Sequence, residues 1–355
     1  LFRSEVTIVS NITIIGAGQM ASALTFPAVE NNNNVRLVGT PLDREIINKA
    51  KDTGFHITLK RQLPSRGIDY YQIEEIEEAL DKADVIICGV SSFGVEWFAD
   101  NILPILPEDI PVLSITKGMI TKDDGEMINY PEYFLRKLLH NKHLCINAVG
   151  GPCTSYELAD KDNSEVVFCG EDINTLRMLK SMFETSYYHI SLSKDIVGVE
   201  CAVALKNAYA LGVSLAIGLS IGRDGSGKEH YNSQAALFGE SIKEARRILK
   251  LVGGEDENMI YFGGDLYVTV FGGRTRKIGT LLGQGYSFKE AMEKLKGVTL
   301  ESIVIAEHAA KFIRCQAEKG IVDIKDFPMI IHIDNIINSG ESVNIPWKAF
   351  ESENI

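Results

Sequence analysis

One lysine stands inside the most apolar stretch of the chain. Cys201–Ser220 reads CAVALKNAYALGVSLAIGLS, and Lys206 is its single charged residue, with Asn207 beside it. An ammonium group within an apolar helix is costly to desolvate, so it needs a partner, a shifted pKa or a chemical task. The task open to it is acid or base catalysis, for which its pKa must fall from about 10.4. The structural alternative is a core-helix lysine that extends to the surface.

A second lysine follows a predicted buried strand. Pro111–Ile115 has the β-branched, apolar character of a strand, and Thr116, Lys117 and Gly118 come directly after it. Gly150-Gly151-Pro152 follows another such strand, His143–Val149. In open parallel sheets, ligands bind outside the carboxyl ends of the strands. Lys117 and Gly151 are therefore candidate ligand-contacting residues, although a solvated loop is the commoner place for a lysine.

A third stretch could bind an anion. Gly263–Gly279 reads GGDLYVTVFGGRTRKIG and contains Asp265, Thr269 and a diglycine followed by Arg274 and Thr275. Backbone N–H groups, a hydroxyl and a guanidinium at a helix start can bind one phosphate together. Cations are unfavourable at a helix N-terminus unless an anion balances them. The pattern predicts a phosphate site, with an exposed basic helix start as the alternative.

The first glycine-rich loop predicts a dinucleotide site. The strand Asn11–Gly16 leads into GAGQMASAL, a G-x-G-x-x-A pattern in which Gly16 permits a tight turn and Gly18 lets a diphosphate approach the backbone. A ribose-binding acid is expected at the end of the next strand, Val35–Gly39, but Asp43 lies late and could instead cap the next helix. Arg44 faces either a 2′-phosphate or solvent, so the choice between NAD and NADP stays open.

The elements that position these residues divide the chain into two halves. Strand-like runs alternate with helical segments up to about residue 192, and helical periodicity dominates afterwards. We predict an α/β Rossmann-type doubly wound sheet in a dinucleotide-binding domain (1–192) and an all-α substrate-binding domain (193–355). The further predicted strands are Ile68–Ile73, Asp84–Val90, Ser164–Cys169 and Tyr187–Ile190. The predicted helices of the second half are 201–220, 233–251, 288–296, 300–316 and 328–337.

Composition excludes several classes of protein. The 355 residues carry a net charge of −12, which disfavours a nucleic-acid partner. The six cysteines form no CxxC pair and the histidines no ligand cluster, so we expect reduced thiols, a cytoplasmic location and no metal. Lys206 and two glycines within the apolar stretch favour a buried helix over a membrane span, and no targeting peptide is evident. Gly222–Lys228 resembles a phosphate-binding loop, but Glu229 replaces the required Ser or Thr, and we expect a surface loop.

Taken together, these motifs resemble the soluble, nicotinamide-dependent glycerol-3-phosphate dehydrogenases over nearly the whole chain. The order and spacing of the matching pieces agree with that family. These pieces are GAGQMASAL, SITKGM (Ser114–Met119), GGPCTSYELA (Gly150–Ala159), ALKNAYALG (Ala204–Gly212), NSQAAL (Asn232–Leu237) and GGDLYVTVFGGRTRK.

The resemblance implies a role for each candidate residue. Lys206 and Lys117 would be the catalytic lysines, Lys206 as the acid and base. The implied substrate-binding residues are Asn207, Asp265, Thr269, Arg274, Thr275 and Gly151. The implied cofactor-binding residues are Gly16, Gly18, Gln19, Met20, Phe93, Lys117, Ser155 and Arg274. The implied cofactor is NAD, or NADP, and the implied partners are a small phosphorylated substrate and a second copy of the chain in a homodimer.

The resemblance also implies the reaction, a reversible hydride transfer between glycerol 3-phosphate and dihydroxyacetone phosphate that serves glycerophospholipid synthesis or redox balance. Several positions depart from the family's pattern. Thr275 replaces an asparagine, Lys296 a Glu or Gln, Ser91 a proline, and His56–Ser65 a Tyr-Leu-Pro-Gly stretch. Two alternatives follow from these changes: a dehydrogenase of another phosphorylated polyol or keto-sugar, and a catalytically silent dinucleotide-binding protein.

Overall fold

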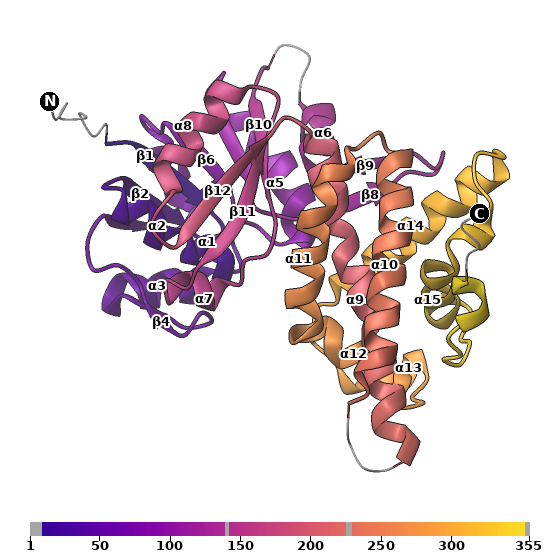
Figure 1. Ribbon diagram of the computed structural model, residues 1–355. Helices are drawn as coiled ribbons and strands as arrows, with labels where there is room; N and C mark the ends of the chain where they lie inside the picture. The colour runs from indigo at the N-terminus through magenta and orange to yellow at the C-terminus, as the bar shows by residue number, and fades with distance from the viewer. Residues whose placement is uncertain (1–8, 139–141, 225–228, 352–355) are drawn as a thin grey trace, which may run out of the picture. The chain divides into compact units, whose positions relative to one another are not determined.

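The computed structural model describes residues 9–138, 142–224 and 229–351 (Figure 1). The chain forms two compact units. The first unit comprises Leu1–Lys117 and Tyr130–Ile196, and the second comprises Gly118–Asn129 and Val197–Ile355. His140 and most of the Gly222–Lys228 loop lie outside the described residues.

The first unit is built on one eight-stranded sheet, in the order β12-β11-β10-β7-β6-β1-β2-β5. All neighbouring strands are parallel except β10 and β11. This is the predicted doubly wound arrangement, with the change of winding direction between β1 and β6. The strands are β1 (Asn11–Ile15), β2 (Asn34–Val38), β5 (Ile68–Tyr71), β6 (Val85–Cys88), β7 (Pro111–Ser114), β10 (Cys145–Gly150), β11 (Ser164–Cys169) and β12 (Tyr188–Ser193).

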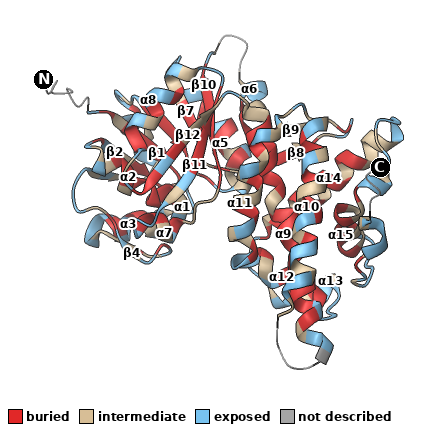
Figure 2. Ribbon diagram, in the orientation of Figure 1, coloured by how far each residue is buried: buried red, intermediate tan, exposed pale blue. Residues whose placement is uncertain are grey.

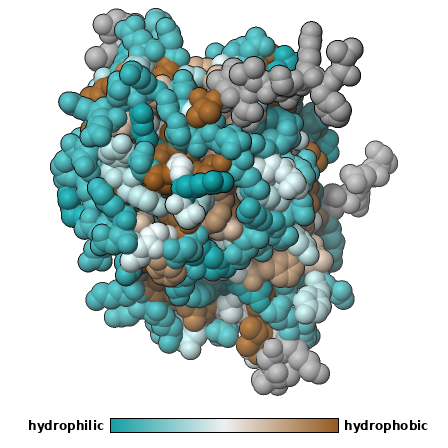
Figure 3. Space-filling model, turned by 90° about the vertical axis from the view of Figure 1, so that its left-hand side faces the viewer, coloured by the Kyte–Doolittle hydropathy of each residue, from teal (hydrophilic) through white to brown (hydrophobic). Residues whose placement is uncertain are grey.

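Helices and one short hairpin pack around this sheet, whose strands are largely buried (Figure 2). The helices are α1 (Gln19–Ala23), α2 (Thr25–Glu30), α3 (Arg44–Thr53), α4 (Ile76–Leu80), α5 (Val95–Asn101), α6 (Tyr130–Lys137), α7 (Ser155–Ala159) and α8 (Ile173–Phe183), and the hairpin joins β3 (Phe55–His56) to β4 (Arg61–Gln62). The surface turned to the viewer in Figure 3 is mostly hydrophilic, with apolar residues in small separate patches.

The division into units differs from the predicted domains in two segments, 118–129 and the short stretch 193–196, which belongs to the first unit. The prediction assigned all of 1–192 to the first domain, but the hairpin of β8 (Met119–Thr121) and β9 (Met127–Asn129) belongs to the second unit. Met119 is 2% exposed and joins the core of that unit. Thr121 donates its backbone N–H to Nδ1 of His308 (3.0 Å) and its hydroxyl to the His308 carbonyl (2.9 Å). Such pairing between distant segments leaves no periodic signal in the sequence.

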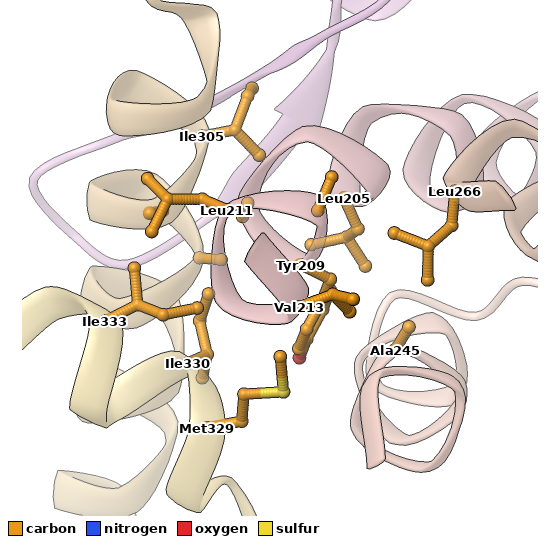
Figure 4. Close-up of a cluster of buried hydrophobic side chains, with 14 of the residues drawn as sticks. Leu205, Tyr209, Leu211, Val213, Ala245, Leu266, Ile305, Met329, Ile330 and Ile333 are labelled. Atoms are coloured by element: carbon orange, nitrogen blue, oxygen red, sulfur yellow. The ribbon is translucent and has the colours of Figure 1, made fainter. Parts of the chain in front are cut away.

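The second unit is helical and is arranged around α9 (Ile196–Asp224), a 29-residue helix. The other helices are α10 (Tyr231–Leu251), α11 (Met259–Val270), α12 (Gly273–Gly283), α13 (Phe288–Lys294), α14 (Glu301–Glu318) and α15 (Pro328–Asn338). Figure 4 shows Leu205, Tyr209, Leu211 and Val213 of α9 among side chains from α10, α11, α14 and α15. Because α9 is apolar on every face, neighbours have to cover it from several directions.

The same helix has the length and apolar composition of a membrane span, and within the described part of the chain it is the single helix that does. In the structure, 89% of its most apolar 18-residue window is buried. A core helix of a soluble protein passes the same test. The burial therefore agrees with the predicted core helix.

Glycines bring α12 into close contact with α9. A Cβ added to Gly218 of α9 would lie 2.1 Å from the Thr280 carbonyl oxygen. In the reverse direction, a Cβ on Gly283 of α12 would lie 2.1 Å from the Leu215 carbonyl oxygen, and one on Gly279 would lie 2.6 Å from the Leu211 carbonyl oxygen. Only glycine permits these backbone approaches, so the spacing of glycines on both helices fixes where α12 lies against α9.

A buried carboxylate connects α9, α10 and α15. Glu244 of α10 is fully buried and accepts hydrogen bonds from the Tyr209 hydroxyl (3.1 Å) and from the N–H groups of Met329 (2.6 Å) and Ile330 (3.0 Å). It thereby caps the first turn of α15, whose N–H groups have no partner within their own helix. Burial raises the pKa of Glu244 to about 8, although these three hydrogen bonds favour the ionised form.

Ionisation of Glu244 makes the stability of the protein depend on pH. The folded state holds the proton more tightly than the unfolded chain, in which a glutamate has a pKa of about 4.3. Its contribution to the free energy of unfolding is therefore full below pH ~4.3 and decreases as the pH rises through about 8. We expect Glu244→Gln to abolish this decrease in urea denaturation measured across that range. Glu45→Gln, at an exposed position of α3, is the matched control, and parallel curves for the Glu244 variant and the wild type would contradict the prediction.

Candidate functional site

The glycine loop lies where the winding direction of the sheet changes. Gly16 follows β1 with φ of +107°, a conformation that favours glycine, and a Cβ there would lie 2.7 Å from the Gly89 carbonyl group. Gly89 follows β6, and a Cβ on it would lie 2.6 Å from the Cβ of Ala21. The three small residues therefore let β1, β6 and α1 approach one another closely. Crevices at such a switch point are where open α/β sheets bind ligands.

Gly18 has a different reason to be glycine. It is the N-cap of α1, no side chain caps that helix, and a Cβ on it would meet only the Gly89 carbonyl oxygen at 3.9 Å. The chain itself therefore leaves room for a side chain at Gly18. A glycine retained beside open backbone N–H groups at a helix start suits the close approach of a diphosphate. The residues present thus fit a dinucleotide cofactor.

The other predicted residues of the first unit lie at the carboxyl ends of neighbouring strands. Lys117 follows β7 and donates from Nζ to the carbonyl of Gly151, which follows β10 (2.7 Å). Ser155, at the start of α7, donates from Oγ to Oε1 of Gln19 in α1 (3.4 Å). Phe93 follows β6 and is 61% exposed. The sheet thus gathers the glycine loop and three further candidate segments along one edge.

Three of the predicted residues of the second unit, Lys206, Asp265 and Thr269, are linked at one nearly buried ion pair. Nζ of Lys206 on α9 lies 2.5 Å from Oδ1 of Asp265 on α11, and their side chains are 15% and 3% exposed. Thr269, one turn beyond Asp265, donates its hydroxyl to the Asp265 carbonyl (2.7 Å). Asn207 is 9% exposed, and its amide forms no hydrogen bond with the described part of the chain. An almost buried amide of this kind is available to a ligand.

The anion-binding segment begins as predicted at a helix start. Gly272 is the N-cap of α12, with no side-chain cap, and Gly273 has φ of +80°. Arg274 is exposed and forms no hydrogen bond or ion pair with the described residues, whereas Arg276 pairs with Glu229 and donates to the Val270 carbonyl (3.0 Å).

Thr275, the next predicted phosphate ligand, is only 8% exposed. The two arginines therefore divide their roles: one holds the fold and the other is free to bind an anion.

Sequence reasoning missed the residues that support the glycine loop. Oδ2 of Asp43 accepts from the N–H of Ala17 (3.1 Å) and from the N–H and hydroxyl of Thr40 (2.9 and 2.7 Å). Asp43 stands at the suggested N-cap position of α3, but its side chain makes no cap hydrogen bond there. Arg44, the candidate for a 2′-phosphate, pairs with Glu74. No motif signals the contact between Asp43 and Ala17, because it depends on how α3 packs.

The sequence also led us to expect no metal site and reduced thiols. Among the residues that the structure describes, no cluster of His, Cys, Asp and Glu could hold a metal ion. All six cysteines are free, three of them buried and three half-buried. Cys88, the last residue of β6, is fully buried, and burial raises the pKa of its thiol to about 12, so it is unreactive at neutral pH.

Comparison with known families covers both units. The description "NAD-dependent glycerol-3-phosphate dehydrogenase N-terminus" matches residues 11–176, and "NAD-dependent glycerol-3-phosphate dehydrogenase C-terminus" matches residues 195–347. The NADP(+)-dependent glycerol-3-phosphate dehydrogenase of Archaeoglobus fulgidus is 34% identical over 287 residues, which cover 80% of this chain and 83% of the relative. The glycerol-3-phosphate dehydrogenase [NAD(P)+] of Clostridium acetobutylicum is 29% identical over 300 residues, 82% of this chain and 84% of the relative.

Solved structures share the fold. The glycerol-3-phosphate dehydrogenase of Plasmodium falciparum has a TM-score of 0.81 at 21% identity, over 98% of this chain and 96% of the other. That of Coxiella burnetii has a TM-score of 0.77 at 20% identity, over 96% and 98%. The predicted family and fold are confirmed, and with them a nicotinamide-dependent oxidoreductase. The chain belongs to the NAD-dependent glycerol-3-phosphate dehydrogenase family.

Proposed function

We propose that the protein catalyses the reversible oxidation of glycerol 3-phosphate to dihydroxyacetone phosphate, and that Lys206 moves the proton. The single observation that carries this assignment is the Lys206–Asp265 ion pair on the apolar helix α9. An ammonium group that is nearly buried there and bonded to a carboxylate is held in position for proton transfer. The family assignment supports the reaction, and the names of the relatives support glycerol 3-phosphate as the substrate and a nicotinamide dinucleotide as the cofactor.

The proton and hydride leave the same alcohol in the oxidation. The C2 hydroxyl gives its proton to the Lys206 amine as the C2–H bond breaks and a carbonyl forms. In the reduction, the Lys206 ammonium returns the proton to the carbonyl oxygen. A bound nicotinamide dinucleotide would supply the hydride acceptor or donor. Asp265 holds Nζ in one place through both directions, and Asn207 offers an unpaired amide to a substrate hydroxyl.

The first unit is assigned to the cofactor. We infer that the loop of Gly16, Gly18, Gln19 and Met20 binds the diphosphate, and that the further cofactor and substrate contacts come from the carboxyl ends of neighbouring strands. Those contacts are assigned to Phe93, Lys117, Gly151 and Ser155. The hydrogen bond between Lys117 and the Gly151 carbonyl supports this, because it holds the ammonium at the sheet edge where such ligands bind. Arg274, with Thr275 beside it, is assigned to the substrate phosphate and the cofactor.

Removing the Lys206 amine should abolish the chemical step without abolishing cofactor binding. For Lys206→Met we expect kcat for dihydroxyacetone phosphate reduction to fall by about 10²- to 10⁴-fold, the usual contribution of a general acid. The measurement is NADH or NADPH absorbance, combined with calorimetric titration of the cofactor. Lys289→Met, at an exposed position of α13, is the control. Turnover at the wild-type rate in the Lys206 variant would refute the assignment.

With the cofactor at a saturating concentration, removing the Arg274 guanidinium should affect only substrates that carry a phosphate. We expect Arg274→Ala to lower kcat/KM for dihydroxyacetone phosphate by about 10- to 100-fold, since hydrogen bonds between charged groups contribute about 1.5–3 kcal/mol. Dihydroxyacetone, which lacks the phosphate, serves as the matched substrate and should be reduced equally slowly by both proteins. An equal loss with both substrates would instead indicate a general structural effect. A panel of phosphorylated polyols and keto-sugars in the same assay tests the substrate itself.

We further infer a cytoplasmic homodimer that supplies or consumes glycerol phosphate for lipid synthesis or redox balance. The resemblance to the family supports the dimer, and the six free cysteines support a reducing compartment. Light scattering coupled to size-exclusion chromatography should give about twice the mass of the 39.2 kDa chain. A mass of one chain at micromolar concentration would contradict the dimer.

A further inference from the structure

Two side chains hold the Ala17 peptide of the glycine loop from opposite ends. The Ala17 N–H donates to Oδ2 of Asp43 (3.1 Å), and the Ala17 carbonyl lies 3.0 Å from Nε2 of His56. Nδ1 of His56 accepts from the N–H of Leu59 (3.0 Å), so Nε2 must carry the proton that reaches Ala17. Each hydrogen-bonding group of this residue, between Gly16 and Gly18, is therefore fixed from outside the loop.

The packing of α3 brings Asp43 to this position. Gly39 directly follows β2. A Cβ on it would lie 2.7 Å from the Ile47 side chain and 3.3 Å from the Cβ of Asp43. The absence of a side chain at Gly39 lets the first turn of α3 approach the end of the strand. Oδ2 of Asp43 then receives three donors, one from Ala17 and two from Thr40. The carboxylate is directed toward the loop by these bonds.

His56 completes the arrangement from the segment that departs from the family's pattern. It is fully buried, and burial lowers the pKa of its imidazole, while the hydrogen bond to Ala17 and the charge of Asp43 oppose that shift. The neighbouring carbonyl of Thr58 accepts from Nε2 of Gln19 (2.9 Å), the residue after Gly18. The hairpin segment thus contacts the loop at two consecutive points.

The hydrogen bonds of Asp43 bear on whether this residue binds the adenosine ribose of the cofactor. An acid at the end of the second strand ordinarily bonds the ribose 2′-hydroxyl and disfavours a 2′-phosphate. Between Val38 and Asp43 the chain has Gly39, Thr40, Pro41 and Leu42, with no carboxylate. Asp43 is the first acid after the strand, and its bonded oxygen is used for the loop.

We propose that Asp43 is a positioning residue, which orders the dinucleotide loop through Ala17 and does not select between NAD(H) and NADP(H). This inference rests on the proposed function only in that the cofactor is a nicotinamide dinucleotide. A residue that orders the loop affects both cofactors by the same factor, because the diphosphate is common to them. A residue that binds the ribose 2′-hydroxyl affects NADH far more than NADPH.

The test measures dissociation constants of NADH and NADPH by calorimetric titration for the wild type, Asp43→Ala and Asp43→Asn. We expect Asp43→Ala to weaken both by about 10- to 100-fold at an unchanged NADPH-to-NADH ratio, as for a lost charge-assisted hydrogen bond. Asp43→Asn retains an acceptor and should recover part of the affinity for both cofactors. The matched controls are Asp52→Ala and Asp52→Asn, at an exposed position of the same helix, which should bind as the wild type does.

Two results would overturn the proposal: a selective loss of NADH affinity, or no change for either cofactor. Melting temperatures of the free proteins identify a variant that fails to fold, and Asp43→Asn then carries the test. Binding is read without turnover. An inactive wild type that binds both dinucleotides would therefore count against the proposed reaction and leave the assignment of Asp43 intact.

Discussion

A helix with no polar face has to be covered from every direction, and this constraint shapes the second unit. Residues from α10, α11, α14 and α15 pack on α9, and glycines bring α12 into backbone contact with it. The ammonium of Lys206, nearly buried on this helix, then needs partners close by. Asp265 of the covering helix α11 is one of them. The need to cover α9 and the need to pair Lys206 are met by the same packing, so the geometry of the candidate proton donor follows from the fold.

In the first unit, close packing and hydrogen bonds position loop backbone rather than a buried ammonium group. Parallel strands bring their carboxyl ends to one edge, and Gly16 and Gly89 allow β1, β6 and α1 to approach one another closely there. Polar side chains then fix the backbone rather than the ligand: Lys117 binds the Gly151 carbonyl, and Asp43 and His56 bind Ala17. Preorganised backbone donors lose little conformational freedom when a charged ligand binds.

Much of the fold was predictable because it depends on periodicity. β1, β6, β7 and β11 lie within a residue or two of the predicted strands, and α10 and α15 within two residues of the predicted helices. The glycine loop was recognisable because glycines stand at the start of a helix, and Lys206 because a charged residue stands in an apolar helix. Both residue types are unfavourable at these places. Such unfavourable residues are typical of functional positions.

What the sequence did not reveal depends on contacts between distant segments. The hairpin of β8 and β9 belongs to the second unit because Thr121 pairs with His308, 187 residues later. Asp265 bonds to Lys206 across 59 residues of sequence, and no spacing pattern signals that contact. Spacing alone also left open whether Asp43 binds a ribose or caps a helix. Glu244, which joins three helices, gave no signal at all, since a buried acid and an exposed acid look alike on a helix of mixed character.

The insertion of residues 118–129 has a consequence for dissecting the molecule. Because the backbone passes between the units three times, after Lys117, Asn129 and Ile196, no single cut yields two complete pieces. A fragment that ended at Ile196 would carry the hairpin without its helix, and would expose Met119, which is 2% exposed in the intact chain and belongs to the core of the second unit. A fragment that began at Val197 would lack this hairpin, and the part of α14 that contacts β8 would be uncovered. To obtain the second unit complete, residues 118–129 would have to be joined to the segment that begins at Val197.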